Sequence, residues 1–350
     1  MTHIDPDIFH FWINRYLGDN YYSQYKCIEA GVNQDDCAII RLDKEKKLII
    51  TTDYLNANPI ALELGIGNFY DLGRITVASN ISDLCGTGAQ PIGFLLGIAS
   101  GKETSSDNIM DFVKGVKYEL DKIKVPLIGG DTKLGNSNSF YGVAVGFADN
   151  SRKLFPKNSA KENDILWVSG NIGSVSASVQ GLSLNWGTDT WKKWAIESII
   201  KPKLPTRLSK QIALRKMGNG GTDLSDGLGM DLLSLCKASS LGVHIDTEKI
   251  PTNFNVQKLA NHLSIPAWFY AIIGGGDFQF IVSTSKRHKS TMEKLGFKEI
   301  GMLKNISYGC KIEYQSQVFD MPNFGHQDAR GKNFGEEIAY LLEQLKILLL

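Results

Sequence analysis

Six aspartates are the residues of this sequence that could do chemistry, because each stands at an expected turn or beside a small, hydroxylated or glycine residue. They occur in the segments QDD, TTD, NISD, GGDT and LSDG, at Asp35, Asp36, Asp53, Asp83, Asp131 and Asp226. A single aspartate in a turn is most often an Asx-turn or a helix cap. Six of them favour a shared role, since carboxylates that converge repel one another and stay ionised only beside a cation.

The expected cation is Mg²⁺, and the expected ligand is a nucleoside triphosphate. Oxygen ligands without His or Cys favour Mg²⁺ over a transition metal. Gly129 and Gly130, next to Asp131, would let phosphate oxygens approach main-chain N–H groups. The standard nucleotide signatures are absent: GIASGK at 97–102 is one residue short of a phosphate-binding loop, and the glycines at 218–221 do not complete GxGxxG.

Composition argues against several other classes of protein. The 350 residues fit about two domains, and 43% apolar with 21% charged residues is ordinary for a globular chain. The 38 basic and 37 acidic residues are interspersed, which predicts no nucleic-acid partner and no binding to a membrane surface. Five cysteines without a CxxC pair favour reduced thiols and a cytoplasmic protein. We expect no signal peptide and no membrane span.

Strands and helices that alternate along the chain are expected to position the aspartates. Periodicity predicts strands at 47–53, 91–99, 125–131 and 140–148, and helices at 71–88 and 106–123. The polar, proline-containing segment 150–163 predicts a domain boundary. Beyond it comes a strand at 165–170, and the chain closes with a helix that should dock through an apolar stripe at Ile338, Leu341, Leu342, Leu345 and Leu349.

The order of these motifs resembles a known family. From about residue 30 to 330, the series QDDCAII, TTDYL, DLGRITVASNISDLCGTGAQP, GGDT, AKENDILWVSGNIGS, TDLSDGLGMDL and GGGDFQF resembles the thiamine-monophosphate kinase branch of the PurM-like ATP-binding superfamily. The resemblance implies an N-terminal α+β domain, 1–150, that pairs in a homodimer to form a barrel-like sheet, and a C-terminal α/β domain, 151–350. ATP would lie in the cleft between the domains, held through several Mg²⁺ ions.

The resemblance also implies roles for individual residues. The implied metal or metal-water ligands are Asp35, Asp36, Thr52, Asp53, Asp83, Asp131 and Asp226. The implied contacts to the nucleotide phosphates are Asn80, Gly129, Gly130 and Thr132. Asp131 and Asp226 would lie nearest the β- and γ-phosphates, and Lys157 stands where these kinases have an arginine beside the transferred phosphate.

The leading hypothesis is therefore phosphoryl transfer from ATP to a small, phosphorylated acceptor, with thiamine monophosphate as the default from the resemblance. Positioning and charge neutralisation would supply most of the rate enhancement. The sequence departs from the family pattern at Gln34, Gly276 and Gln279, and two alternatives stay open. One is an ATP-dependent ligase or cyclase that activates an amide or carbonyl oxygen, and the other is a nucleotide-binding scaffold without catalysis.

Overall fold

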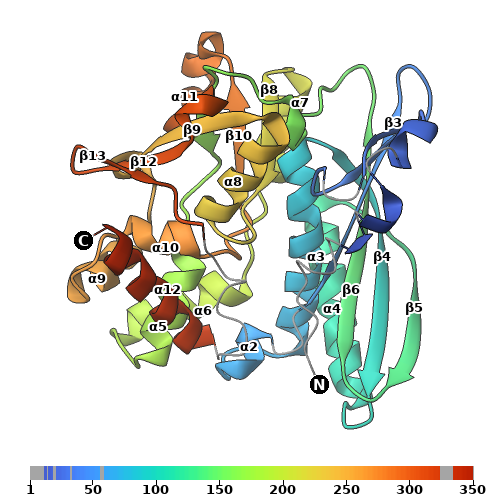
Figure 1. The fold of residues 1–350 in the computed structure, drawn as a ribbon. Helices are drawn as coiled ribbons and strands as arrows, with labels where there is room; N and C mark the ends of the chain where they lie inside the picture. Colours follow the sequence, from blue (N-terminus) through green and yellow to red (C-terminus); the bar gives the residue numbers. More distant parts are fainter. Residues whose placement is uncertain are drawn as a thin grey trace.

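Two β-sheets stand side by side in the computed structural model of the protein, and the long helix α3 (Phe69–Thr87) runs between them (Figure 1). The structure describes residues 12–13, 15–18, 21–31, 34–55, 59–323 and 334–349. A short 3-10 helix, η1 (Tyr21–Gln24), precedes the first sheet. Within the described ranges, no helix is long and apolar enough to cross a bilayer.

The N-terminal sheet has six strands in the order β1-β2-β3-β6-β4-β5. Its strands are β1 (Ile28–Ala30), β2 (Ala38–Arg41), β3 (Lys47–Tyr54), β4 (Gln90–Gly101), β5 (Leu127–Gly135) and β6 (Ser139–Ala148). All neighbours pair antiparallel except β4 and β5, which are parallel because helix α4 (Ser106–Ile123) forms the crossover between them. The described part of the sheet is open, with β1 and β5 at its edges.

Helix α3 begins and ends where its sequence provides caps. Asn68 and Asp71 form a reciprocal capping box at the start, and Gly88 adopts the left-handed conformation that ends the helix. Most of its residues are buried, because α3 contacts β3, β6 and α4 on one side and β8 of the second sheet on the other. The helices predicted at 71–88 and 106–123 are thus confirmed within two residues.

The C-terminal sheet has seven strands in the order β13-β12-β9-β11-β7-β10-β8. These are β7 (Ile165–Val168), β8 (Gly218–Asp223), β9 (Leu241–Asp246), β10 (Phe280–Thr284), β11 (Lys298–Asn305), β12 (Cys310–Tyr314) and β13 (Gln317–Asp320). Among the described strands of this sheet, only β9 and β12 pair in parallel. The expected two-domain fold with mixed sheets and helices is confirmed, but the C-terminal half is largely antiparallel instead of α/β, because the other neighbouring strands run in opposite directions.

Helices surround the C-terminal sheet. They are α5 (Ser174–Ser183), α6 (Asp189–Ile200), α7 (Thr206–Leu214), α8 (Leu228–Ser239), α9 (Phe254–His262), α10 (Trp268–Ile273), α11 (Lys289–Leu295) and α12 (Phe334–Leu349). Single turns of 3-10 helix occur at η2 (Lys157–Ser159), η3 (Thr247–Lys249), η4 (Lys286–His288) and η5 (Ile306–Tyr308). Helix α12 packs on α5 and α10, and burial confirms the predicted docking stripe at Ile338, Leu341, Leu342 and Leu345. The side chain of Leu349, the fifth residue of that stripe, lies outside the described part of the chain.

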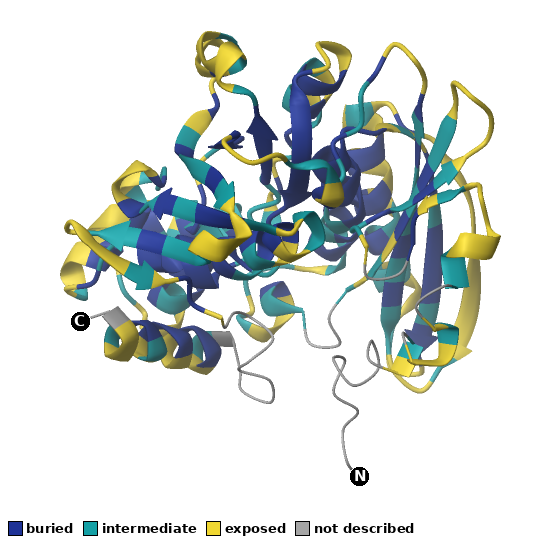
Figure 2. Ribbon diagram, turned by 45° about the horizontal axis from the view of Figure 1, so that its top comes forward, coloured by how far each residue is buried: buried dark blue, intermediate teal, exposed yellow. Residues whose placement is uncertain are grey.

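The two faces of the N-terminal sheet differ in what covers them. Alternate residues of β6 are buried beneath α3. The opposite face is only half-buried, although it is apolar: Ile50 lies directly across from Val145, and Leu48 from Phe147. Edge strand β5 is exposed along almost its whole length (Figure 2). The described residues therefore form no closed barrel by themselves.

Candidate active site

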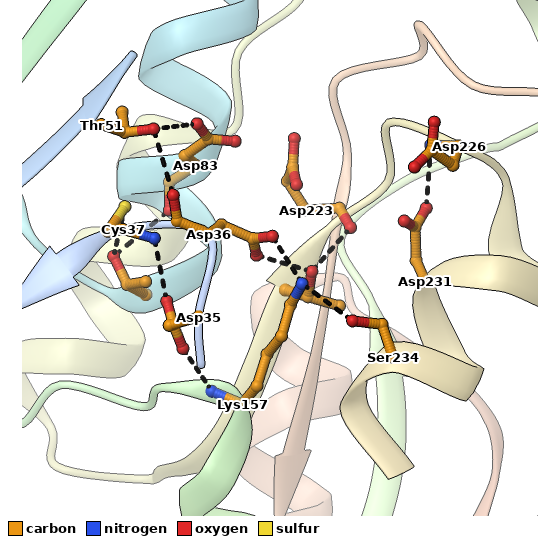
Figure 3. Close-up of polar contacts among 12 residues, drawn as sticks. Asp35, Asp36, Cys37, Thr51, Asp83, Lys157, Asp223, Asp226, Asp231 and Ser234 are labelled. Atoms are coloured by element: carbon orange, nitrogen blue, oxygen red, sulfur yellow. Dashed lines mark hydrogen bonds and ion pairs between the residues drawn. The ribbon is translucent and has the colours of Figure 1, made fainter. Parts of the chain in front are cut away.

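Seven aspartates from segments far apart in the sequence gather between the two sheets, and Figure 3 labels all of them except Asp53. We call them the aspartate cluster: Asp35, Asp36, Asp53, Asp83, Asp223, Asp226 and Asp231. They come from the turn before β2, from β3, from α3, from the end of β8 and from the start of α8. The structure thus brings together five of the six aspartates singled out in the sequence.

Helix α3 and strand β3 set the N-terminal side of the cluster. Thr51 and Asp53 share one face of β3 because side chains alternate along a strand. The Thr51 hydroxyl donates to Asp83 Oδ2 on α3 at 2.5 Å. One residue earlier on α3, the Ser82 hydroxyl donates to Asp223 Oδ2 at 2.6 Å and so ties the helix to the C-terminal sheet.

A glycine lets the two halves come this close. Gly86 of α3 lies against the backbone of β8, where a Cβ at position 86 would stand 2.5 Å from the Asp223 nitrogen and 2.8 Å from the Thr222 carbonyl carbon. Any larger residue would push helix and strand apart. The distance between the carboxylates of Asp83 and Asp223 therefore depends on this absent side chain.

Lys157 is the cation of the cluster. Its Nζ lies 2.5 Å from Asp36 Oδ1, and the other oxygen of Asp36 accepts a hydrogen bond from the Thr222 hydroxyl at 2.8 Å. The Lys157 backbone N–H donates to Asp35 Oδ2 at 2.7 Å, and its Nζ reaches the Ser234 hydroxyl at 3.2 Å. Burial opposes the charge of Lys157, but the ion pair and hydrogen bond with Asp36 outweigh it and raise the pKa of the ammonium. Lys157 therefore stays charged and joins segments of both halves.

Burial and mutual repulsion raise the pKa of several carboxyls in the cluster. Burial, reinforced by Asp36, raises the pKa of Asp35 to about 7 and that of Asp223 to about 8. Burial, then Asp36 and Asp226, raises the pKa of Asp53 to about 6. Burial also raises the pKa of Asp83 well above its ordinary value. One buried ammonium does not compensate so many carboxylates, so the cluster favours further positive charge.

The donor set of the cluster fits Mg²⁺. All its carboxyl and hydroxyl ligands are oxygens, which Mg²⁺ prefers. In the described part of the chain, no three His, Cys, Asp or Glu side chains are already grouped around one metal position. That arrangement suits Mg²⁺ on a nucleotide, because the ion commonly uses one or two carboxylates together with phosphate oxygens and water.

Four of the predicted site residues lie elsewhere, on edge strand β5. Asp131 is 61% exposed in its side chain and pairs with Lys133 at 3.3 Å. Asp53 and Gly130 share one row of the sheet, with β6 and β4 between their strands. Three strand spacings put Asp131 about 14 Å from Asp53. The structure therefore does not bring Asp131 to the aspartate cluster, nor its neighbours on β5, Gly129, Gly130 and Thr132.

Two more predicted roles do not fit the structure. The Thr52 side chain lies on the other face of β3 and donates to the Gly142 carbonyl at 2.8 Å, because strand alternation turns it away from Asp53. The Asn80 side chain is completely buried. It accepts from the Asp53 backbone N–H at 2.9 Å and donates to the Thr76 carbonyl at 2.9 Å. Asn80 thus holds β3 on α3 and does not line a phosphate path.

The sequence prediction missed Thr51, Thr222, Asp223 and Asp231. Strand alternation could have identified Thr51, two residues from Asp53. Asp223 and Asp231 flank Asp226 in TDLSDGLGMD, and Asp231 accepts from the Asp226 backbone N–H at 3.3 Å. No local pattern indicates that Asp223 meets Ser82, because the two are 141 residues apart.

An apolar pocket of about 230 Å³ opens beside Ser225, the neighbour of Asp226. Its lining includes Tyr54, Ile75 and Phe278, and no charged residue lines it among those described. Phe278 has a φ of +52°, which is rare for a residue with a side chain. The adjacent residue, Asp277, is fixed in place and so stabilises this backbone conformation. Its carboxylate accepts backbone hydrogen bonds from Gly173, Ser174 and Val175 at the start of α5, at 2.6, 3.1 and 3.2 Å.

Two departures from the family pattern have different surroundings here. Gly276 lines the pocket. Gln279 does not: its Oε1 accepts from the Ser169 hydroxyl at 2.8 Å and its Nε2 donates to the Lys203 carbonyl at 3.2 Å. The side chain of Gln279 therefore links the end of β7 to the start of β10.

Comparison with known proteins finds thiamine-monophosphate kinases among the curated relatives, and structures of both thiamine-monophosphate kinase and the hydrogenase maturation protein HypE among the solved structures. The family model of the AIR synthase related protein, N-terminal domain, matches residues 34–148. The thiamine-monophosphate kinase of Buchnera aphidicola subsp. Schizaphis graminum is 31% identical over 314 residues, which cover 83% of this chain and 91% of that protein. The enzyme of the same name from Escherichia coli K12 is 29% identical, covering 80% and 84%.

Solved structures share the fold. The structure of "AaThiL complexed with AMPPCP and TMP" superposes with a TM-score of 0.72 at 22% identity, covering 87% of this chain and 95% of that one. A likeness at this identity bears on the fold alone.

Proposed function

The chain belongs to the thiamine-monophosphate kinase family, and on that premise we propose that it transfers the γ-phosphoryl group of ATP to the phosphate of thiamine monophosphate, with Mg²⁺ at the aspartate cluster. The observation that carries the proposal is the convergence of carboxylates from both halves of the chain around Lys157. Mg²⁺ on the nucleotide would neutralise phosphate charge and polarise the transferred phosphoryl group.

The residues of the chain would act by holding and orienting the reactants. Asp53 and Asp226 affect each other electrostatically and offer carboxylates to metal ions. Lys157 holds the Asp36 side chain in place through its 2.5 Å contact. No general base is needed, because the second pKa of a phosphate monoester is near 6 and the acceptor phosphate is already ionised at neutral pH.

The apolar pocket beside Ser225 is the proposed acceptor site. Thiamine consists of two aromatic rings, one of them positively charged, and the aromatic side chains of Tyr54 and Phe278 line the pocket. Stacking and cation–π contact with these rings would hold thiamine without an acidic residue. The phosphate of the acceptor would then point toward Asp226.

Phosphorus NMR with ATP, Mg²⁺ and thiamine monophosphate tests the reaction. We expect ADP and a new phosphoanhydride signal on the acceptor. Inorganic phosphate with a new C–N bond in some other substrate would instead indicate the ligase alternative, and nucleotide binding without turnover would indicate a scaffold.

Variants connect the reaction to the cluster. Asp226→Asn should lower turnover by at least about 100-fold. Asp121→Asn, on the exposed surface of α4, should leave it unchanged. Equal activity in Asp226→Asn and the wild type would reject the site.

We further propose that the enzyme works as a homodimer through the N-terminal sheet. On β5, Leu127, Ile128 and Leu134 are 48%, 56% and 92% exposed, and the face that carries Ile50 and Val145 is apolar and only half-buried. A second copy would cover this edge and face, which are otherwise liable to associate. Light scattering should give twice the chain mass for the wild type and a smaller mass for Leu134→Lys. A monomeric wild type would contradict the dimer.

A cytoplasmic location of the protein stays a prediction.

A further inference from the structure

A second groove, of about 710 Å³, lies outside the aspartate cluster and the acceptor pocket, and its lining is strongly basic. It is formed by the linker after β6, the turn after α7 and the 3-10 helix η4 before α11. Two carboxylates and five Lys or Arg residues line it, whereas the whole chain has 37 acidic and 38 basic residues. We call it the basic groove, with Lys153, Lys161, Lys216, Lys286 and Arg287 as its cations.

The two carboxylates are engaged by other groups. Asp164 is buried and accepts from Asn219 Nδ2 at 2.9 Å, from the Ser283 hydroxyl at 3.0 Å and from the Lys161 backbone N–H at 3.2 Å. Glu162 accepts from Asn305 at 3.3 Å. None of the five cations forms a salt bridge with a carboxylate of the described residues. The five cations outnumber the two carboxylates, so a net positive charge remains in the groove for a ligand.

One cation is fixed in position and the others surround it. Half-buried Lys153 donates from Nζ to Asn219 Oδ1 at 2.7 Å, and Asp164 orients that amide from the other end. Burial, and then repulsion from Lys161, lower the pKa of Lys153, although the charge of Asp164 acts in the opposite direction. The other four cations are exposed, and Arg287 also donates from Nε to the His288 ring at 3.1 Å.

We propose that the basic groove binds the oligophosphate group of a small ligand. Five cations against two engaged carboxylates suit an anion of about three charges or more. Lysine ammonium groups bind phosphate oxygens as point charges, and Arg287 adds a fork for two of them. Met217 is the one apolar residue among the described residues that line the groove, so the phosphate part of the ligand supplies the recognition.

The basic groove is separate from the proposed catalytic site. Strand β8 has Asn219 at the groove and Asp223 in the aspartate cluster, about 13 Å further along the strand. The linker likewise has Lys153 at the groove and Lys157 in the aspartate cluster. A ligand in the groove would therefore contact residues on two segments that also position the cluster.

Calorimetry with sodium tripolyphosphate tests the proposal. The measurement uses the full chain with EDTA, because phosphate binding at the aspartate cluster requires a metal ion. We expect one molecule bound per chain, and affinity about tenfold or more lower in the double variant Lys286→Gln/Arg287→Gln. The matched double variant Lys114→Gln/Lys117→Gln removes two exposed cations of α4 and should bind like the wild type.

Several outcomes would overturn the proposal. They are an absence of binding to the wild type, equal affinities of the wild type and the groove variant, and an equal loss in both double variants. Displacement of tripolyphosphate by a short DNA duplex at equal phosphate concentration would overturn the small-ligand assignment in favour of a nucleic acid. Thermal melting checks that the variants fold, and turnover of thiamine monophosphate should be unchanged in both, so failure here is distinct from failure of the proposed reaction.

Discussion

Replacing Asp53 by asparagine should make the metal-free protein more stable while it abolishes activity. Burial and the charges of Asp36 and Asp226 raise the pKa of Asp53 to about 6, against an ordinary value near 4. The unfolded chain therefore ionises at a lower pH than the folded protein. Stability is lost as pH rises from about 4 to about 6, and the full cost is present above that range.

The size of the effect follows from the displacement of the pKa. At 1.36 kcal/mol for each unit of pKa, the ionised Asp53 costs about 3 kcal/mol at pH 8 and about half of that at pH 5. Asparagine carries no charge, so Asp53→Asn should recover this free energy. The unfolding entropy is about 2.1 cal/mol/K per residue, and the chain has 350 residues. Dividing the recovered free energy by this entropy gives a rise in Tm of about 4 °C at pH 8.

Thermal melting in EDTA at pH 5 and pH 8 provides the assay. Asp43→Asn is the control, because backbone hydrogen bonds from Glu45 and Lys46 lower the pKa of Asp43, so that asparagine should give no gain there. Adding MgCl₂ at pH 8 should stabilise the wild type and have less effect on Asp53→Asn. A variant that is no more stable than the wild type at pH 8, or that gains equally at both pH values, would refute the reasoning.

Three further predictions address other parts of the protein. Phe278→Ala should raise KM for the acceptor about three- to tenfold through the lost ring contact and leave KM for ATP unchanged; a change in both would contradict the acceptor site. Gly86→Ala should destabilise the protein by roughly 1–3 kcal/mol, because its Cβ meets the backbone of β8, whereas Gly129→Ala, whose Cβ meets only Leu95 at 3.7 Å, should be tolerated in the same melting experiment. Asp131 lies too far from Asp53 within one chain to share an ion with it, so we expect Asp131 to act across the proposed dimer interface. Mixing and re-associating the inactive Asp53→Ala and Asp131→Ala chains should then restore about a quarter of the wild-type activity. No recovery from fully exchanged chains would exclude this role.

Local periodicity was sufficient to predict the long helices and strands of the N-terminal half. The helix expected at 106–123 has those bounds, because its apolar residues recur on one face and Ser105 caps its start. The strand expected at 140–148 likewise falls within β6. These features depend on residues a few positions apart, which a single sequence displays directly.

The composition of the site was harder to predict, because it depends on packing between distant segments. Asp223 enters the cluster through Gly86 and Ser82 of α3, and nothing near position 223 indicates this. Asp131 has the same local pattern as the clustered aspartates, yet it lies on an edge strand. The order of strands in the sheet determines the distance from Asp131 to the aspartate cluster, and the local sequence does not indicate that order.

The contact of α3 with β8 also has a consequence for how the protein loses its structure. The buried apolar side chains of both sheets form one continuous core, in which Leu84 of α3 and Phe280 of β10 both take part. Neither half can melt without exposing apolar surface of the other, so heating should give a single calorimetric transition. Access for nucleotide must then come from small movements of loops, since a wide hinge opening would break the same core.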